Sequence, residues 1–217
     1  MERAIAEINE LKPDIVVCSG DLTTFGFKEE FAQAKRYLDT VECDALVVVP
    51  GNHDSRNVGY VHFEQLIGER SSVVRRDGIS VVAVDSTEPD LDHGQIGRGR
   101  YGWIEQQFEE PARLKVFVLH HHLLPIPGTG RERNVVHDAG DTLEVLQRAR
   151  VNLVLSGHKH VPYAWRLEDL FVVNAGTVSS MRVRGRPFPN GDPVIRSAKF
   201  RASSTAKRKC SGIRRSR

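Results

Sequence analysis

Short apolar runs rich in β-branched residues recur along the chain, and helical patterns separate several of them. A strand with one wet face alternates apolar and polar residues, so continuous apolar runs predict strands covered on both faces. We expect strands over 15–18, 45–49, 79–84, 115–119, 151–155 and 170–173, and helices over 2–11, 28–39, 101–109 and 141–149. This alternation predicts an α/β fold.

The loops after these strands hold most of the unusual residues. They carry Asp21, Asn52-His53-Asp54, the three histidines at 120–122, and His158-Lys159-His160, so that six of the nine histidines lie in them. In open α/β sheets, ligands bind outside the carboxyl ends of the strands, where such loops meet. The distribution therefore predicts a polar site at that edge.

Each of these motifs alone is weak evidence. Gly20-Asp21 is more often a turn than a ligand, and the run at 52–54 follows Pro-Gly, where turn chemistry also favours Asn and Asp. His158 and His160, at positions i and i+2 of an extended segment, would point the same way. Three adjacent histidines at the end of an apolar strand are costly to bury without partners.

Together and in this order, the motifs resemble those of the calcineurin-like metallophosphoesterase family. The matching residues are Gly20-Asp21, Gly51-Asn52-His53-Asp54, the histidines at 120–122, and Gly157-His158-Lys159-His160. The resemblance covers about residues 1–181 and, through the run at 120–125, looks closest to the cyclic-nucleotide phosphodiesterase branch. It implies a metallophosphoesterase-type β-sandwich flanked by helices. It also implies that the substrates are small phosphate mono- or diesters. Their hydrolysis would use a dinuclear centre of Mn, Fe, Zn or Ni.

The resemblance also assigns roles to the metal ligands. Asp21 would bridge the two metals, and Asn52 and His158 would bind the second metal with one histidine of the triplet. We choose His120 because it directly follows the strand, with His121 left open. 

Three further residues receive roles in the same way. His160 would reach the first metal. His53 would face the phosphate, where it stabilises charge or protonates the leaving oxygen, and Asp54 would hold that imidazole in the right orientation.

The sequence departs from the family at its amino end. Family members open with a strand ending in Asp-x-His, whereas residue 2 already lies in the helix that should follow it. We therefore expect the first strand to be missing and the first metal site to be incomplete, with Asp21 and His160 as its ligands. The alternative is a catalytically inactive, truncated remnant that binds at most one metal, or nucleic acid through its carboxyl end.

Charge divides the chain into two parts, a domain over 1–181 and a tail over 182–217. The tail holds twelve Lys and Arg residues and one acid, Asp192, so it carries +11 and leaves −8 for the domain. Few large apolar residues lie in the tail, so we expect it to be disordered. Nucleic acid binding through it is possible but not favoured. We expect no membrane span, and three scattered cysteines favour a reducing, cytoplasmic compartment.

Overall fold

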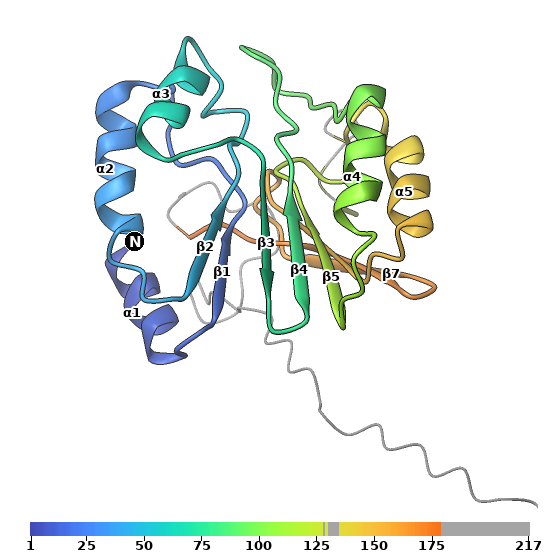
Figure 1. Ribbon diagram of the computed structural model, residues 1–217. Helices are drawn as coiled ribbons and strands as arrows, with labels where there is room; N and C mark the ends of the chain where they lie inside the picture. The colour runs from blue at the N-terminus through green and yellow to red at the C-terminus, as the bar shows by residue number, and fades with distance from the viewer. Residues whose placement is uncertain (128, 130–134, 179–217) are drawn as a thin grey trace, which may run out of the picture.

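The computed structural model describes residues 1–127, 129 and 135–178. The expected tail over 182–217, and with it the domain boundary at 181, lies outside the described residues. Within them the chain forms a mixed α/β structure, with β-strands in the middle and helices on both outer sides (Figure 1). None of the described helices combines the length and apolar character that crossing a membrane requires.

The helices and strands alternate for most of the described chain. The helices are α1 (Glu2–Glu10), α2 (Lys28–Leu38), α3 (Gly59–Leu66), the 3-10 turn η1 (Arg98–Arg100), α4 (Tyr101–Gln107) and α5 (Ala139–Arg148). The strands are β1 (Ile15–Cys18), β2 (Ala45–Val48), β3 (Ser72–Arg76), β4 (Ile79–Ala83), β5 (Leu114–Val118), β6 (Leu153–Ser156), β7 (Tyr163–Leu167) and β8 (Leu170–Asn174).

The described strands form two sheets. β1 and β2 pair in parallel, and the other strands form a sheet in the order β3-β4-β5-β6-β8-β7. Within this larger sheet β4, β5, β6 and β8 run parallel, while the outer strands β3 and β7 are antiparallel to their neighbours. Several parallel strands of both sheets therefore end in loops that can meet at one edge.

Alternating side chains give the larger sheet two buried faces. In β4, Val82 faces one hydrophobic cluster with residues of α4 and α5, and Val81 faces the other. This second cluster also contains Val47 of β2, and Ile15 and Val17 of β1 pack against it. The small sheet thus packs against one face of the large sheet, and α4 and α5 cover the opposite face (Figure 1). This sandwich accounts for continuous apolar strands, since both faces are covered.

The remaining helices lie on the side of the small sheet (Figure 1). Phe31 of α2 and Phe63 of α3 are fully buried, and their rings meet edge to face with centroids 6.1 Å apart. Buried aromatic pairs of this kind combine large apolar area with a preferred geometry. They fix α2 and α3, and the loops that precede them, on the outer side of β1 and β2.

The α/β prediction is confirmed, and each of the six predicted strands has a counterpart in the structure. The predicted helices are also present, with ends that agree to within two residues. Helix α3 and strands β3 and β7 were not predicted. Among the described residues β1 pairs only with β2, and the absence of a first strand stays a prediction.

Candidate metal centre

Two glycine contacts hold together the loops that follow β1 and β2. Gly20 and Asp21 both have left-handed backbone, with φ of 93° and 58°. A Cβ built at Gly51 would overlap Oδ1 of Asp21, and one built at Gly20 would lie 2.5 Å from the backbone nitrogen of Gly51. Glycine is required at both positions, because any side chain would force the loops apart. The close approach places the Asp21 carboxylate directly beside the loop that carries Asn52.

Four of the predicted ligands converge on one point. Nε2 of His120 lies 3.2 Å from Oδ1 of Asn52, 3.2 Å from Nδ1 of His158 and 3.5 Å from Oδ1 of Asp21. Oδ1 of Asn52 lies 2.9 Å from Nδ1 of His158. His120 and Asn52 are 1% and 2% exposed, so water cannot readily solvate these atoms. The loops after β1, β2, β5 and β6 each contribute one residue, as the strand-end argument predicts.

Contacts around this point fix which atoms face it. Nδ1 of His120 lies 2.6 Å from the carbonyl oxygen of Ser19, so that nitrogen donates its proton and Nε2 carries a lone pair. Nδ2 of Asn52 donates to Asp92 at 3.0 Å, which leaves Oδ1 facing the imidazoles. Lone pairs of nitrogen and oxygen therefore face one another, and the one proton that His158 could place between them cannot satisfy them all.

The donor set fits a divalent transition-metal ion. Ligand atoms that lie 2.0–2.2 Å from a metal at tetrahedral or octahedral angles are about 3.0–3.5 Å apart. The distances between His120, Asn52, His158 and Asp21 fall close to this range. Imidazole nitrogens with amide and carboxylate oxygens suit Mn, Fe, Zn or Ni. A cation among these atoms would satisfy all four lone pairs.

His121 adds a further buried donor atom. Its Nδ1 lies 2.9 Å from Oγ of Ser86, while its Nε2 is buried without a hydrogen-bond partner among the described residues. His120, His121 and His158 each offer a ligand atom within 4.8 Å of the others. Burial, followed by the neighbouring histidines, lowers the pKa of His121 and of His158 well below the ordinary value. His120 is the member of the triplet that contacts Asn52, and the choice between it and His121 stays a prediction.

His160 does not belong to the close group formed by His120, His121 and His158. Among the described side chains it belongs to no set of three His, Cys, Asp or Glu residues whose ligand atoms meet within 4.8 Å. The expectation of an extended segment is wrong. His158 and His160 have left-handed backbone, with φ of 72° and 58°, and Lys159 N bonds to the Gly157 carbonyl at 2.9 Å. The segment bends, so the two imidazoles do not share a face through strand alternation. The role of His160 stays a prediction.

His53 is oriented by a backbone carbonyl, which corrects the expected role of Asp54. Nδ1 of His53 lies 2.9 Å from the Thr24 oxygen, so Nδ1 donates and Nε2 is left for other partners. Within the described residues Asp54 makes no hydrogen bond to that ring. Its buried carboxylate instead accepts hydrogen bonds from the backbone nitrogens of Leu22, Thr23 and Gly51, and from Oγ1 of Thr23. Burial, and then the charge of Asp21, raise the pKa of Asp54 to about 6. Asp54 therefore ties the two loops together.

Sequence reasoning missed the residues around the ligands. Asp92 accepts the amide of Asn52, Ser19 accepts the imidazole of His120, and Thr24 accepts that of His53. Two of these partners act through backbone carbonyls, which any residue type supplies. Asp92 lies 40 positions from Asn52 in a loop without a motif. Ser19 and Thr24 lie close to Gly20-Asp21 in the sequence. Only that position could have suggested that they lie near the metal-binding side chains.

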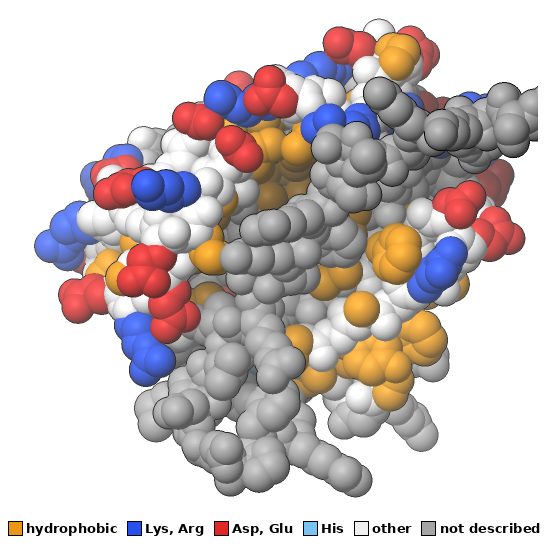
Figure 2. All heavy atoms as spheres, turned by 90° about the horizontal axis from the view of Figure 1, so that it is seen from below, with side chains coloured by type: hydrophobic (Ala, Val, Ile, Leu, Met, Phe, Trp, Pro, Cys, Tyr) orange, Lys and Arg blue, Asp and Glu red, His pale blue; other side chains and the backbone are white. Residues whose placement is uncertain are grey.

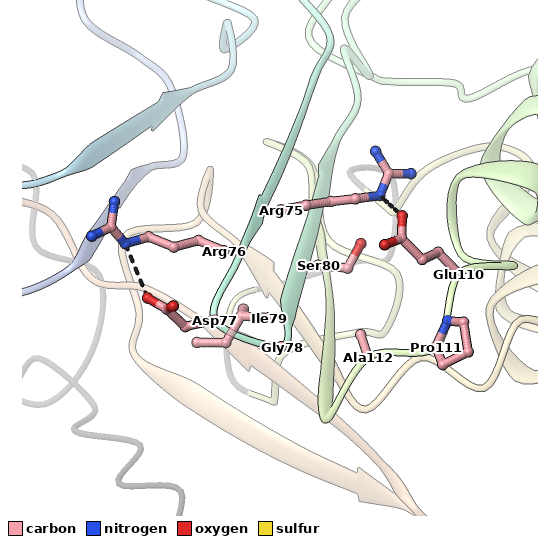
Figure 3. Close-up of a pocket in the computed structure, with 9 residues that line it drawn as sticks. All are labelled: Arg75, Arg76, Asp77, Gly78, Ile79, Ser80, Glu110, Pro111 and Ala112. Carbon is pink, nitrogen blue, oxygen red and sulfur yellow. Dashed lines mark ion pairs between the residues drawn. The ribbon is translucent and has the colours of Figure 1, made fainter.

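A separate cavity lies at the opposite end of the large sheet, by the turn between β3 and β4. It has a volume of about 240 Å³ and is lined by Arg75, Arg76, Asp77, Gly78, Ile79, Ser80, Glu110, Pro111 and Ala112 (Figure 3). Arg75 pairs with Glu110 at 3.1 Å, and Arg76 pairs with Asp77 at 3.2 Å. Figure 2, which views the molecule from below, likewise shows charged side chains of both signs close together. The cavity has no uncompensated charge to offer a ligand.

Comparisons with known proteins agree with the site. Residues 1–162 match the family model described as calcineurin-like phosphoesterase. The chain is 29% identical over 164 residues to a probable cyclic nucleotide phosphodiesterase of Synechococcus. The matched region covers 73% of this chain and 63% of that protein. It is 26% identical over 157 residues to a cAMP/cGMP dual specificity phosphodiesterase of Mycobacterium tuberculosis. This match covers 69% of the present chain and 49% of that protein. The chain thus spans between about half and two thirds of these relatives' length.

Solved structures share the fold. A purple acid phosphatase from yellow lupin superposes with a TM-score of 0.60 at 15% identity, covering 80% of this chain and 38% of that one. A dimetal phosphatase from Danio rerio superposes with a TM-score of 0.57 at 13% identity, covering 80% and 76%. At these identities the likeness concerns the arrangement of strands and helices alone.

Proposed function

Because the chain belongs to the calcineurin-like phosphoesterase family, we propose that it hydrolyses phosphate esters with the help of bound divalent metal ions. The convergence of buried lone pairs on one point, between Asp21, Asn52, His120 and His158, carries the proposal. A buried polar atom without a partner costs about 1–3 kcal/mol, and Nε2 of His121 beside these ligands is such an atom among the described residues, which favours a bound cation. We propose manganese as the first ion to test in the hydrolysis assay.

The chain's own ligands would hold the metal from both sheets. Asn52, His120 and His158 would bind the second ion, Asp21 would bridge, and His160 would contribute with Asp21 to the first. When bound, such ions polarise the phosphate and lower the pKa of water toward neutrality. Asp21 also accepts the backbone N–H of His53 at 3.1 Å, so its carboxylate is oriented before any ion binds.

His53 would act on the leaving group. Its Nδ1 is engaged by the Thr24 carbonyl at 2.9 Å, so the ring can exchange a proton with substrate only through Nε2. A positioned imidazole of this kind contributes typically about 10²–10⁴-fold to turnover by general acid catalysis. In this proposal the imidazolium form of His53 donates its Nε2 proton to the ester oxygen as the P–O bond breaks, which leaves the neutral Nδ1–H ring, and Asp54 keeps the loop behind the ring in place.

The substrate class follows from the relatives. Several are named as cyclic nucleotide phosphodiesterases, and this supports a small phosphodiester as the substrate. The second candidate is an inactive remnant that binds one metal. It is supported by the described residues holding one close group of His, Cys, Asp or Glu side chains, His120 with His121 and His158, and by the incomplete first metal site that the sequence predicts.

Metal content and the hydrolysis of bis-p-nitrophenyl phosphate, both measured on the 217-residue chain with manganese added, test the two candidates. We expect about two ions per chain, with turnover that EDTA removes. Asp21→Asn should lower turnover by more than about 100-fold, beyond the usual effect of an outer-shell partner. One ion per chain without turnover would contradict the enzyme proposal and support the remnant.

A further inference from the structure

We propose that Arg56 and Asp92 form a positioning pair that orients the Asn52 amide toward the metal and the His53 imidazole toward the substrate. The inference rests on the proposed function, because it concerns how that same site is held in shape. Neither residue belongs to a family motif quoted above, and neither touches the point on which the ligand atoms converge. Both act through another residue.

Asp92 determines which end of the Asn52 amide faces the imidazoles. Oδ1 of Asp92 accepts Nδ2 of Asn52 at 3.0 Å and a guanidinium nitrogen, Nη2, of Arg56 at 3.0 Å. A carboxylate can only accept hydrogen bonds, so it selects the NH₂ end of the amide. The opposite orientation would direct two N–H groups toward His120 and His158 and repel a cation. Asp92 therefore keeps the oxygen of Asn52 available as a ligand.

Arg56 connects this contact to His53. Its second terminal nitrogen, Nη1, donates to the carbonyl oxygen of Thr24 at 3.3 Å, and that oxygen also accepts Nδ1–H of His53 at 2.9 Å. The planar guanidinium reaches Asp92 and Thr24 at once, which the single ammonium of a lysine cannot do in the same geometry. One side chain thus bridges the partners of the metal ligand and of the imidazole.

The pair contributes little to overall stability, which separates positioning from simple structural support. The Asp92 side chain is 71% exposed and that of Arg56 is 29% exposed. Solvent-exposed ion pairs contribute about 0–1 kcal/mol. The loop does not depend on the pair either, because Asp90 accepts the backbone N–H of Asn57 at 2.6 Å and donates its own to Ser55 at 3.2 Å. Removal of Asp92 should leave this loop in place.

The first experiment measures metal affinity by titrating the metal-free 217-residue chain with Co²⁺ and following visible absorption. Asp92→Ala should weaken binding about 10–100-fold, the effect typical of outer-shell partners. Asp92→Asn keeps an acceptor oxygen and should restore most of the affinity. The matched control is Asp141→Asn, which removes the acid of an exposed ion pair with Arg98 (3.4 Å). Equal affinity in Asp92→Ala and wild type would overturn the inference.

The second experiment observes the two oriented groups directly by ¹⁵N NMR of the metal-free protein. Asp92→Ala should shift the Asn52 side-chain amide signal, and Arg56→Lys should move the His53 tautomer away from the Nδ1–H form. Neither variant should change the thermal midpoint by more than the control does. Unchanged Asn52 and His53 signals would refute the pair. If wild type binds no Co²⁺, the proposed function fails, while these metal-free spectra still decide the positioning role.

Discussion

The two ends of the sheets are both polar, and they differ in how their charges are matched. At the carboxyl ends, His120, Asn52 and His158 direct lone pairs toward one another at 2.9–3.2 Å. At the opposite end, Arg75 and Arg76 line a cavity, and each is paired with an acid (Figure 3). The comparison shows that a hollow with charged walls is not by itself a site. Buried lone pairs that outer contacts hold face to face are the stronger indication.

The energetic reason lies in the cost of burial. A buried polar atom without a partner costs about 1–3 kcal/mol, whereas an exposed ion pair contributes about 0–1 kcal/mol. The ligand end therefore keeps a costly arrangement, which Ser19 and Asp92 hold in place through His120 and Asn52. The arrangement of paired charges at the cavity end costs little free energy. Substitutions at the two ends should accordingly differ in what they change.

The largest effect is expected at the ligand end, from His53→Ala. Turnover of bis-p-nitrophenyl phosphate should fall about 10²–10⁴-fold, because the variant lacks the proposed proton donor to the leaving oxygen. Bound metal should remain, since His53 is not among the converging ligands. Metal analysis beside steady-state kinetics checks both statements. Metal loss as great as in Asp21→Asn would contradict the role given to His53.

An intermediate effect is expected from Asp138→Asn, in the scaffold between α4 and α5. The carboxylate accepts hydrogen bonds from Tyr101 (2.6 Å) and from the backbone nitrogens of Ile96 (3.0 Å) and Gly97 (2.7 Å). Partial burial alone would raise its pKa, yet these bonds outweigh burial and lower it. The variant should lose about 1–3 kcal/mol of unfolding free energy at neutral pH.

The pH dependence of that loss follows from the lowered pKa. A carboxyl whose folded pKa lies below the ordinary value of about 3.9 stabilises the protein above that value. The contribution disappears as the pH falls through the folded pKa, so wild type and variant should converge in strong acid. Urea unfolding at pH 7 and below pH 3 measures the difference, with Asp141→Asn as control. A difference that grows in acid would refute the assignment.

The smallest effect is expected at the cavity, from Arg75→Met. The variant loses an exposed ion pair with Glu110 and a hydrogen bond to the Gln107 carbonyl at 2.8 Å. Unfolding free energy should change by about 1 kcal/mol or less, with turnover and metal content unchanged. Thermal unfolding and the same hydrolysis assay check this. A tenfold loss of turnover would show that the cavity takes part in function and would remove the contrast between the two ends.

Much of the fold could be predicted from local pattern because its central strands are covered on both faces. β4 and β5 each end in consecutive apolar residues, Val81–Ala83 and Val116–Val118, and this is the signal that burial on two sides produces. β3 ends in Arg75 and Arg76, β7 alternates exposed Ala164 and Arg166 with half-buried residues, and α3 starts without a capping side chain. The secondary structure of these peripheral elements depends on contacts with neighbouring elements, which the local sequence does not reveal. The division of the strands into two sheets is likewise a tertiary property.

The site shows the same limit. The convergence of side chains such as His120 and Asn52, which can bind a metal, could be predicted because that capacity is tied to residue identity. The contact between His53 and the Thr24 carbonyl could not, since a backbone oxygen carries no residue signature. The bend at 157–160 was also missed, because left-handed φ is uncommon at any single non-glycine position, even for His, which adopts it more often than most residues.

The position of the ligands on two different sheets has a thermodynamic consequence. Asp21 and Asn52 follow strands of the small sheet, whereas His120 and His158 follow strands of the large one. A cation that binds all four would link the two layers, and it can do so only while they are packed together. Linkage would then add about 2.7 kcal/mol to the unfolding free energy at a metal concentration 100 times the dissociation constant. For such a protein the supply of metal would set how firmly the sandwich closes as well as how fast it works.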